Sequence, residues 1–287
     1  KKKGGGGRGM YSSRKSLVTE KGEELLLEIK ESVINDAFAK ERSFIKNHFS
    51  IKQVHIVAGD FINNEATREE MTNLLLDKVN AKITKECVIG VSGGSTMYYI
   101  AGRANETFGY GKDVTITPIR GGLSVVNTEY QANDIASKMA KNSGHNYQLL
   151  HAPDNIGQKA LEELVKEPVV KNALDVIGKT SIIIHSIGNA FEMANRRKSS
   201  KDILKVLEEK NAVCESFGSY FDENGSEIFK TSTIGMSFKD VDGIDNVFTI
   251  VGGEEKADAV YSYLNTKPAN MTLIIDEAIC KKIIYHE

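Results

Sequence analysis

Short apolar segments alternate with longer amphipathic segments from Gln53 to the end of the sequence. The apolar segments are rich in β-branched residues, as in CVIGV (87–91) and TSIIIH (180–185), and carry apolar residues at nearly every position. Strands of this kind are buried on both faces, and the segments between them have the length and spacing of helices. The alternation therefore predicts an α/β fold built on a doubly wound, mainly parallel sheet. We expect this domain to occupy residues 51–287.

Three local expectations within the domain can be compared with the structure. NYQLLHAP (146–153) is predicted as one of the strands, and residues 189–211 are predicted as a helical arm. Glu223–Gly225, which lies between two β-rich runs, is predicted as the turn of a hairpin.

The composition limits the partners that the whole chain can have. Its 37 Lys and Arg residues and 39 Asp and Glu residues give a formal charge of −2, which provides no overall signal for nucleic acid but does not exclude a separate basic module. Cys87, Cys214 and Cys280 have no spacing typical of a zinc site or a disulfide framework, and such sparse use fits a reducing cytoplasm. No apolar run approaches the length of a membrane span. We therefore expect a soluble cytoplasmic protein with no membrane partner.

The first part of the sequence differs from the rest. Residues 1–9, KKKGGGGRG, are basic and glycine-rich, which is typical of a linker or of the end of another module. The stretch TEKGEELLLEI then begins with helix N-cap chemistry and continues with apolar residues at helical spacing, weakly as far as about Phe49. These features predict a linker or module remnant at residues 1–18 and a connector helix at residues 19–50.

Glycine-rich segments follow four of the predicted strands. They are SGGST (92–96), RGGLS (120–124), SIGNA (186–190) and GGEEK (252–256). The carboxyl ends of parallel strands meet at one edge of a sheet, where loops and helix N-termini converge. Glycines let a ligand approach the backbone, the first amides of a helix favour an anion, and two of the segments each supply a cation. Together the segments predict a site for an anionic small molecule.

Each of these residues also has a purely structural interpretation. Ser95 and Thr96 have the chemistry of helix caps, and spacing alone does not separate capping from phosphate binding. Arg120 could be a solvated surface charge. However, Gly121 and Gly122 beside it leave room for a ligand, and its planar guanidinium matches the geometry of phosphate.

Polar residues further along the chain have the same ambiguity. Glu129 and Gln131 open a predicted helix, so they could cap it or contact sugar hydroxyls. The pair Arg196 and Arg197 is of a kind that most often lies on a solvated face. Glu215 follows a short apolar stretch and is unremarkable by itself. These side chains become candidates only because they accompany the glycine-rich segments.

No segment has the pattern of a nucleotide, cofactor or metal site. No Walker lysine follows the SGGST turn, and GVSGGST is no convincing dinucleotide fingerprint. The histidines and cysteines lack metal-ligand spacing. Residues 90–94 fit the GxSxG pattern of hydrolases, but a triad would need Asp276 and His286 near the end of the chain. We therefore predict no cofactor and no metal, and favour binding over hydrolysis.

Several segments together resemble a known family. The four glycine-rich segments, with KEPVVKNAL (166–174), AVCESFGSYFD (212–222) and VGGEEKADA (251–259), resemble the effector-binding domain of SorC-type bacterial transcription regulators from about Ser16 onward. The resemblance implies a sheet like that of sugar-phosphate isomerases and deaminases. It also implies a repressor of carbohydrate or glycolytic genes that binds fructose bisphosphate or a related glycolytic phosphosugar without turning it over.

The resemblance further implies partners and contact residues. Operator DNA would be bound by a winged N-terminal domain missing from this sequence, and the protein would form a homo-oligomer, either a dimer or a tetramer. Motif matching gives the implied ligand contacts: Gly93, Gly94, Ser95 and Thr96 for one phosphate, Arg120 for phosphate, Gln131 for the sugar, and Arg196, Glu215 and Lys256 completing the pocket.

Two other functions remain open from the residues alone. A sugar-phosphate isomerase or amino-sugar-phosphate deaminase would use the same pocket, with Glu129, Glu215 or Asp276 as a general base and Lys256 as an assisting cation. A protein-interaction module would bind no metabolite. Product formation from sugar phosphates would identify the enzyme, whereas the interaction module predicts no thermal shift with any metabolite.

Overall fold

The computed structural model describes residues 37–122, 128–153 and 157–285 of the chain. A seven-stranded sheet with strand order β1-β11-β10-β5-β2-β3-β4 forms its centre, and each neighbouring pair in it is parallel. The strands are β1 Gln53–Val57, β2 Glu86–Val91, β3 Asp113–Pro118, β4 Asn146–Tyr147, β5 Ile182–His185, β10 Asn246–Val251 and β11 Met271–Asp276. The predicted doubly wound, parallel α/β fold is confirmed.

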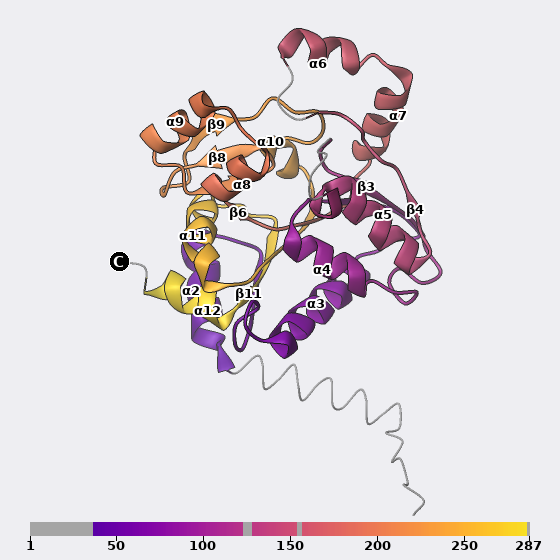
Figure 1. Ribbon diagram of the computed structural model, residues 1–287. Coiled ribbons are helices and arrows are strands. Elements are labelled where there is room, and N and C mark those ends of the chain that lie inside the picture. The colour runs from indigo at the N-terminus through magenta and orange to yellow at the C-terminus, as the bar shows by residue number, and fades with distance from the viewer. Residues whose placement is uncertain (1–36, 123–127, 154–156, 286–287) are drawn as a thin grey trace, which may run out of the picture. The chain divides into compact units, whose positions relative to one another are not determined.

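Helices cover both faces of this sheet (Figure 1). On one face lie α3 Glu65–Asn80, α4 Ser95–Arg103 and α5 Ala132–Ser143, and across the sheet from them lie α7 Pro168–Ile177, α11 Ala257–Asn265 and α12 Glu277–Ile284. The remaining short elements are α6 Gln158–Leu164 and the 3₁₀ turns η1 Thr128–Tyr130 and η2 Glu254–Lys256. Helix α3 begins where it does because the Asn64 side chain accepts the amides of Ala66 and Thr67.

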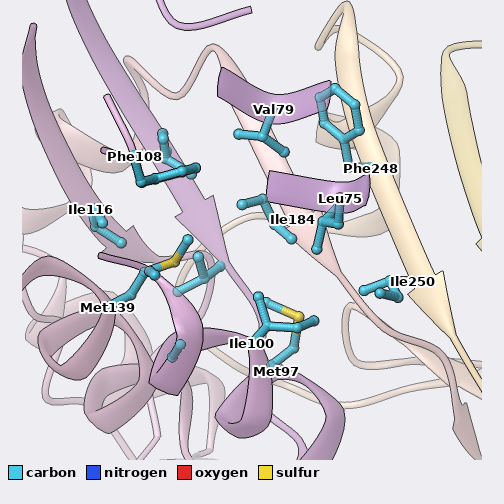
Figure 2. Close-up of a cluster of buried hydrophobic side chains, with 14 of the residues drawn as sticks. Leu75, Val79, Met97, Ile100, Phe108, Ile116, Met139, Ile184, Phe248 and Ile250 are labelled. Atoms are coloured by element: carbon cyan, nitrogen blue, oxygen red, sulfur yellow. The ribbon is translucent and has the colours of Figure 1, made fainter. Parts of the chain in front are cut away.

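The largest apolar core lies between the sheet and α3, α4 and α5 (Figure 2). Leu75 from α3, Ile100 from α4 and Met139 from α5 are fully buried against strand residues such as Ile89 and Ile250. Alternate residues of β2 and neighbouring strands supply this face. The remaining positions pack on the opposite side, which is why the strands read as nearly continuous apolar runs.

A second sheet was not predicted from the sequence. Its strands are antiparallel and lie in the order β6-β7-β8-β9, with β6 Gly188–Asn189, β7 Cys214–Ser216, β8 Ser219–Phe221 and β9 Glu227–Lys230. Helices α8 Ala190–Arg196 and α9 Lys201–Glu209 accompany it, and α10 Phe238–Val241 follows (Figure 1). The turn predicted at Glu223–Gly225 does join two of these strands, so the hairpin is confirmed. The sheet as a whole lacks a sequence signal because three of its strands have only two or three residues.

Two further expectations differ from the structure in detail. The stretch 146–153, predicted as a strand, is a strand only at Asn146–Tyr147. Beyond it, the amide of Leu150 donates to Asn133 Oδ1 and its carbonyl accepts from Asn133 Nδ2, so a side chain takes the place of a neighbouring strand. The predicted helical arm over 189–211 is divided into α8 and α9. Lys198 takes a positive φ, and Ser200 caps the second helix.

Part of the predicted connector helix is described. Helix α2 Ala39–Phe49 falls within the stretch 19–50, and Ile45 and Phe49 are its buried residues. Residues 1–36, which include the predicted linker and the start of the connector, lie outside the described residues. Within the part of the chain that the structure describes, no helix combines the length and the apolar character needed to cross a membrane.

Candidate functional site

Four neighbouring strands of the parallel sheet bring their following loops to one edge. The order β10-β5-β2-β3 places the glycine-rich segments after Val251, His185, Val91 and Pro118 beside one another. Backbone bonds continue past the strand ends: the Ser92 amide donates to the Ile184 carbonyl, 3.1 Å away. The Ser186 amide also donates to Ser92 Oγ at 3.3 Å. The loops after β2 and β5 are therefore joined directly, as the sheet topology requires.

The SGGST segment leads directly into the first turn of α4. Gly94 is the N-cap with φ 119°, a conformation that favours glycine, and its amide donates to the Tyr130 carbonyl at 2.8 Å. A Cβ on Gly93 would lie 2.8 Å from that same carbonyl, so this position also needs glycine. The Gly94 amide is thus used by the protein itself. The amides that α4 leaves without a helical acceptor are those of its first turn, including Ser95, which is exposed, and Thr96, which is buried.

Lys256 reaches the same helix end from the loop after β10. Its Nζ lies 3.4 Å from Thr96 Oγ1, although 160 residues separate the two in sequence. Burial lowers the pKa of the Lys256 ammonium below its usual value, while the nearby carboxylates of Glu255 and Glu192 oppose that effect. A partly buried cation beside open helix amides is an arrangement that attracts an anion.

Asp276 holds the Lys256 loop in place. Its Oδ2 accepts the amides of Gly253 at 2.7 Å and Phe61 at 2.8 Å, and its Oδ1 accepts the amide of Ile279 as the N-cap of α12. Burial raises the pKa of this carboxyl, and the three amide hydrogen bonds act in the opposite direction. Asp276 therefore connects the loop after β10 to the loop after β1 through hydrogen bonds.

Arg196 and Gln131 lie near the SGGST segment from other directions. Arg196 pairs with Glu192 Oε1 at 2.6 Å, and its guanidinium carbon is 6.0 Å from the ring centre of Tyr130, whose carbonyl accepts the Gly94 amide. Gln131 is the N-cap residue of α5, and its Oε1 is 3.4 Å from where a Cβ on Gly122 would be. Both candidates therefore adjoin loops that leave β2 and β3.

Arg120 and Glu215 form a buried ion pair on the β3 side of the edge. Arg120 Nη1 is 3.4 Å from Glu215 Oε1, and the two side chains are only 9% and 6% exposed. Burial by itself would raise the pKa of Glu215. The guanidinium groups of Arg197 and Arg120 outweigh that effect and hold the pKa below its usual value. Gly218 must be glycine here, because a Cβ would collide with the Arg120 guanidinium.

Arg197 belongs to this cluster, although no pattern in the sequence distinguishes it from Arg196. Its Nη2 donates to Glu215 Oε1 at 3.0 Å and its Nη1 donates to Tyr220 Oη at 3.2 Å. The two arginines of the NRRKSS segment thus have different environments: Arg196 is 40% exposed, whereas Arg197 is 16% exposed. The expectation that both arginines lie on a solvated face therefore does not hold for Arg197. No periodic pattern in the sequence indicates which of two adjacent arginines points inward.

The structure gives two of the three candidate general bases other tasks. Glu129 is exposed in η1, Glu215 is ion-paired, and Asp276 caps α12. The serine of the GxSxG pattern, Ser92, donates to the Gly93 carbonyl and accepts the Ser186 amide, which is a structural role, and His286 lies outside the described residues. Over residues 37–122, 128–153 and 157–285, no three His, Cys, Asp or Glu side chains group as metal ligands would.

Residues 35–285 match the protein-family profile described as "Putative sugar-binding domain". The chain therefore belongs to this family, the sugar-binding domain of SorC-type transcription regulators.

The chain is similar to several proteins that are named as transcription regulators. The central glycolytic genes regulator of Bacillus subtilis (strain 168) is 31% identical over 272 residues, covering 94% of this chain and 79% of that protein. The protein of the same name from Priestia megaterium is 31% identical over 278 residues, covering 96% and 80%. A crystal structure of a "putative SorC family transcriptional regulator" from Enterococcus faecalis has a TM-score of 0.79 at 33% identity, covering 85% of this chain and 99% of that one.

Proposed function

We propose that this chain is the effector domain of a transcription repressor of carbohydrate or glycolytic genes, and that it binds a phosphorylated sugar without converting it. The observation that carries the proposal is the contact of Lys256 with the first turn of α4, at the edge of the sheet where the segment that begins at Arg120 also leaves its strand. Burying the Lys256 ammonium costs free energy, so its placement beside the first turn of α4 favours a bound anion. The two curated relatives are named for control of glycolytic genes, which supports a sugar of that pathway.

The nine residues that motif matching assigns remain our proposed site residues: Gly93, Gly94, Ser95, Thr96, Arg120, Gln131, Arg196, Glu215 and Lys256. We assign them different tasks. The Ser95 and Thr96 amides, with Lys256, would hold one phosphate, whereas Glu215 would act by holding Arg120. Phosphate suits the Lys256 ammonium and the Arg120 guanidinium, because it accepts several charge-assisted hydrogen bonds at once.

The main alternative is a sugar-phosphate isomerase or deaminase, for which the same edge would be an active site. Such chemistry needs a general base beside the substrate's acidic carbon with a pKa near the working pH. Glu215 has a lowered pKa and two guanidinium partners, and Asp276 already accepts three amides. These commitments favour a binding role.

The partners of the whole regulator follow from the same proposal. Operator DNA would be bound by a winged module joined to this domain through residues 1–18 and the connector helix at 19–50, in a cytoplasmic homo-oligomer. Regulators that read two half-sites are commonly symmetric oligomers, so ligand binding could alter the spacing of the DNA-binding modules.

A thermal-shift screen tests the proposal. Fructose bisphosphate, fructose 6-phosphate, glucose 6-phosphate and glucosamine 6-phosphate are added separately, with unphosphorylated fructose and inorganic phosphate as controls. We expect at least one sugar phosphate to raise the melting temperature more than either control, with no product detectable by NMR. A screen with no shift would favour the interaction module, and product formation would favour the enzyme.

A further inference from the structure

One carboxylate oxygen organises the buried charges behind the proposed phosphate contacts. Glu215 Oε1 lies 2.8 Å from the Gly218 amide, 3.0 Å from Arg197 Nη2 and 3.4 Å from Arg120 Nη1. All of these donors point to the same atom of a side chain that is 6% exposed. The position of the Arg120 guanidinium is therefore tied to whatever fixes Glu215.

A tight turn fixes the backbone on one side of Glu215. Phe217 and Gly218 join β7 to β8 with positive φ values of 52° and 80°. The positive φ of Phe217 is unusual for a large side chain, and it is held in place because the Phe217 ring packs on His185 with 4.6 Å between ring centres. This turn presents the Gly218 amide to Glu215 and leaves space at Gly218 for the Arg120 guanidinium.

Arg197 fixes the carboxylate from the other side. Its second hydrogen bond, to Tyr220 Oη, anchors its guanidinium to a residue that is 1% exposed. Tyr220 in turn pairs with Glu215 across β7 and β8. The three side chains thus form a compact unit in which each position limits the others.

The end of α8 links this unit to the other half of the proposed site. Arg196 lies near Tyr130, whose carbonyl accepts the Gly94 amide at the start of α4, and the next residue, Arg197, holds Glu215. Because the two arginines are adjacent, a small movement of the α8 end would change the surroundings of both anion-binding groups. Direct contact with the ligand is not needed for Arg197 to affect binding.

We propose that Arg197 is a positioning residue of the effector site, which sets the Arg120 guanidinium for phosphate through Glu215 and Tyr220. The inference rests on the proposed function, because it assumes that Arg120 contacts the sugar phosphate. It adds a role for Arg197, which is not among the proposed site residues, and names Glu215 and Tyr220 as the residues through which Arg197 acts.

Binding measurements with fructose bisphosphate as the probe test this assignment. Isothermal titration gives Kd for the whole chain and for Arg197→Met, which keeps the length of the side chain without its donors. We expect Kd to rise about tenfold to a hundredfold, as losses of charged hydrogen bonds commonly do. Arg197→Lys should give an intermediate Kd. Tyr220→Phe, which removes only one hydrogen bond, should raise Kd by about twofold to fivefold.

A double-mutant cycle separates positioning from general loss of structure. Arg197→Met is repeated in an Arg120→Lys background, which keeps a positive charge so that binding stays measurable. If Arg197 acts through Arg120, the substitution should raise Kd by less than about threefold in that background. Arg103→Met is the matched control, since Arg103 also donates to a glutamate, Glu69, on the exposed surface. It should leave Kd unchanged.

Each other outcome has a distinct meaning. An equal rise in Kd in both backgrounds would overturn the positioning role and indicate that Arg197 acts on the ligand by itself. Unchanged Kd values for Arg197→Lys and Tyr220→Phe would also overturn it, even if Arg197→Met failed to fold. If wild-type protein binds none of the sugar phosphates in the screen, the proposed function is what fails.

Discussion

Two buried regions of this domain have opposite chemistry. The core beneath α3, α4 and α5 consists of residues such as Leu75, Ile100 and Ile250, all 0% exposed (Figure 2). The cluster at the carboxyl edge of the sheet contains Arg120 and Glu215, which as whole residues are nearly as well buried, at 7% and 5% exposed. Burial stabilises the first region, because apolar surface leaves water, whereas it costs free energy in the second, because charges lose their hydration.

The difference indicates what each region is for. An apolar core of this size is sufficient to explain why the sheet and its helices fold together. The charged cluster is not needed for that purpose, and similar volumes of apolar side chains are often as stable or more stable. Its presence at the edge where four loops meet agrees with the ligand site that we propose there. The following predictions test this contrast, beginning with the largest expected effect.

A cavity in the apolar core should reduce stability and leave ligand binding intact. Ile100→Ala removes a fully buried side chain from α4, and we expect a loss of about 2–5 kcal/mol in the free energy of unfolding. Urea denaturation measures this loss, and Ile116→Val, at about 0.5–1.5 kcal/mol, is the conservative control. The contrast between the two regions fails if Ile100→Ala also abolishes the increase in stability given by a sugar phosphate.

Removing the guanidinium at the edge should reduce the stability that the ligand adds. At a ligand concentration about a hundred times Kd, binding adds about 2.7 kcal/mol to stability, and Arg120→Ala should abolish most of that gain. The quantity to measure is the difference between denaturation curves recorded with and without fructose bisphosphate. An undiminished difference would remove Arg120 from the site.

Protonation of His185 should have the next largest effect on the free energy of unfolding. Burial lowers the pKa of His185 to about 3, whereas its unfolded value is about 6.5, so the unfolded chain binds the extra proton first. The stability that neutral His185 provides is therefore complete above about pH 6.5 and is lost as the pH falls toward 3. The slope is at most about 1.4 kcal/mol per pH unit.

Urea denaturation at pH 7, 6 and 5 measures this slope. His185→Gln is the comparison variant, because an amide can still form a hydrogen bond with Thr249, whose Oγ1 lies 2.7 Å from His185 Nε2. The variant should show a flatter dependence on pH. If its slope equals that of the wild type, His185 is not the source of the loss.

An exposed ion pair gives the smallest expected effect. Arg103 contacts Glu69 at 2.9 Å, but both side chains are substantially exposed, at 39% and 52%. Arg103→Ala should therefore change the free energy of unfolding by less than about 1 kcal/mol. A loss comparable to that of Ile100→Ala would show that exposure is a poor guide to the importance of charges in this chain.

The sequence was sufficient to predict the sheet but not the buried cluster. Continuous apolar strands and intervening helices leave few alternatives to a parallel α/β fold, and its topology brings glycine-rich segments to one edge. The short strands β6, β7 and β8 have too few residues to show a period. The inward turn of Arg197 depends on contacts with Glu215 and Tyr220, 18 and 23 residues away, which no local pattern records.

The hydrogen-bond partner of the Gly94 amide could not be predicted from the sequence either. A glycine before a helix predicts an open amide, but here the Tyr130 carbonyl arrives from a segment 36 residues further along and accepts it. Sequence reasoning could select the segment as a candidate anion site, while which of its amides the protein itself uses depends on tertiary structure.

A crystal structure of the chain with fructose bisphosphate bound would show whether the carboxyl edge of the sheet holds the ligand. We expect a phosphate within hydrogen-bond distance of the Ser95 and Thr96 amides and of Lys256 Nζ, with the Arg120 guanidinium also contacting the ligand. A ligand seated away from the ends of β2, β3, β5 and β10, or one that Arg120 does not touch, would contradict this expectation.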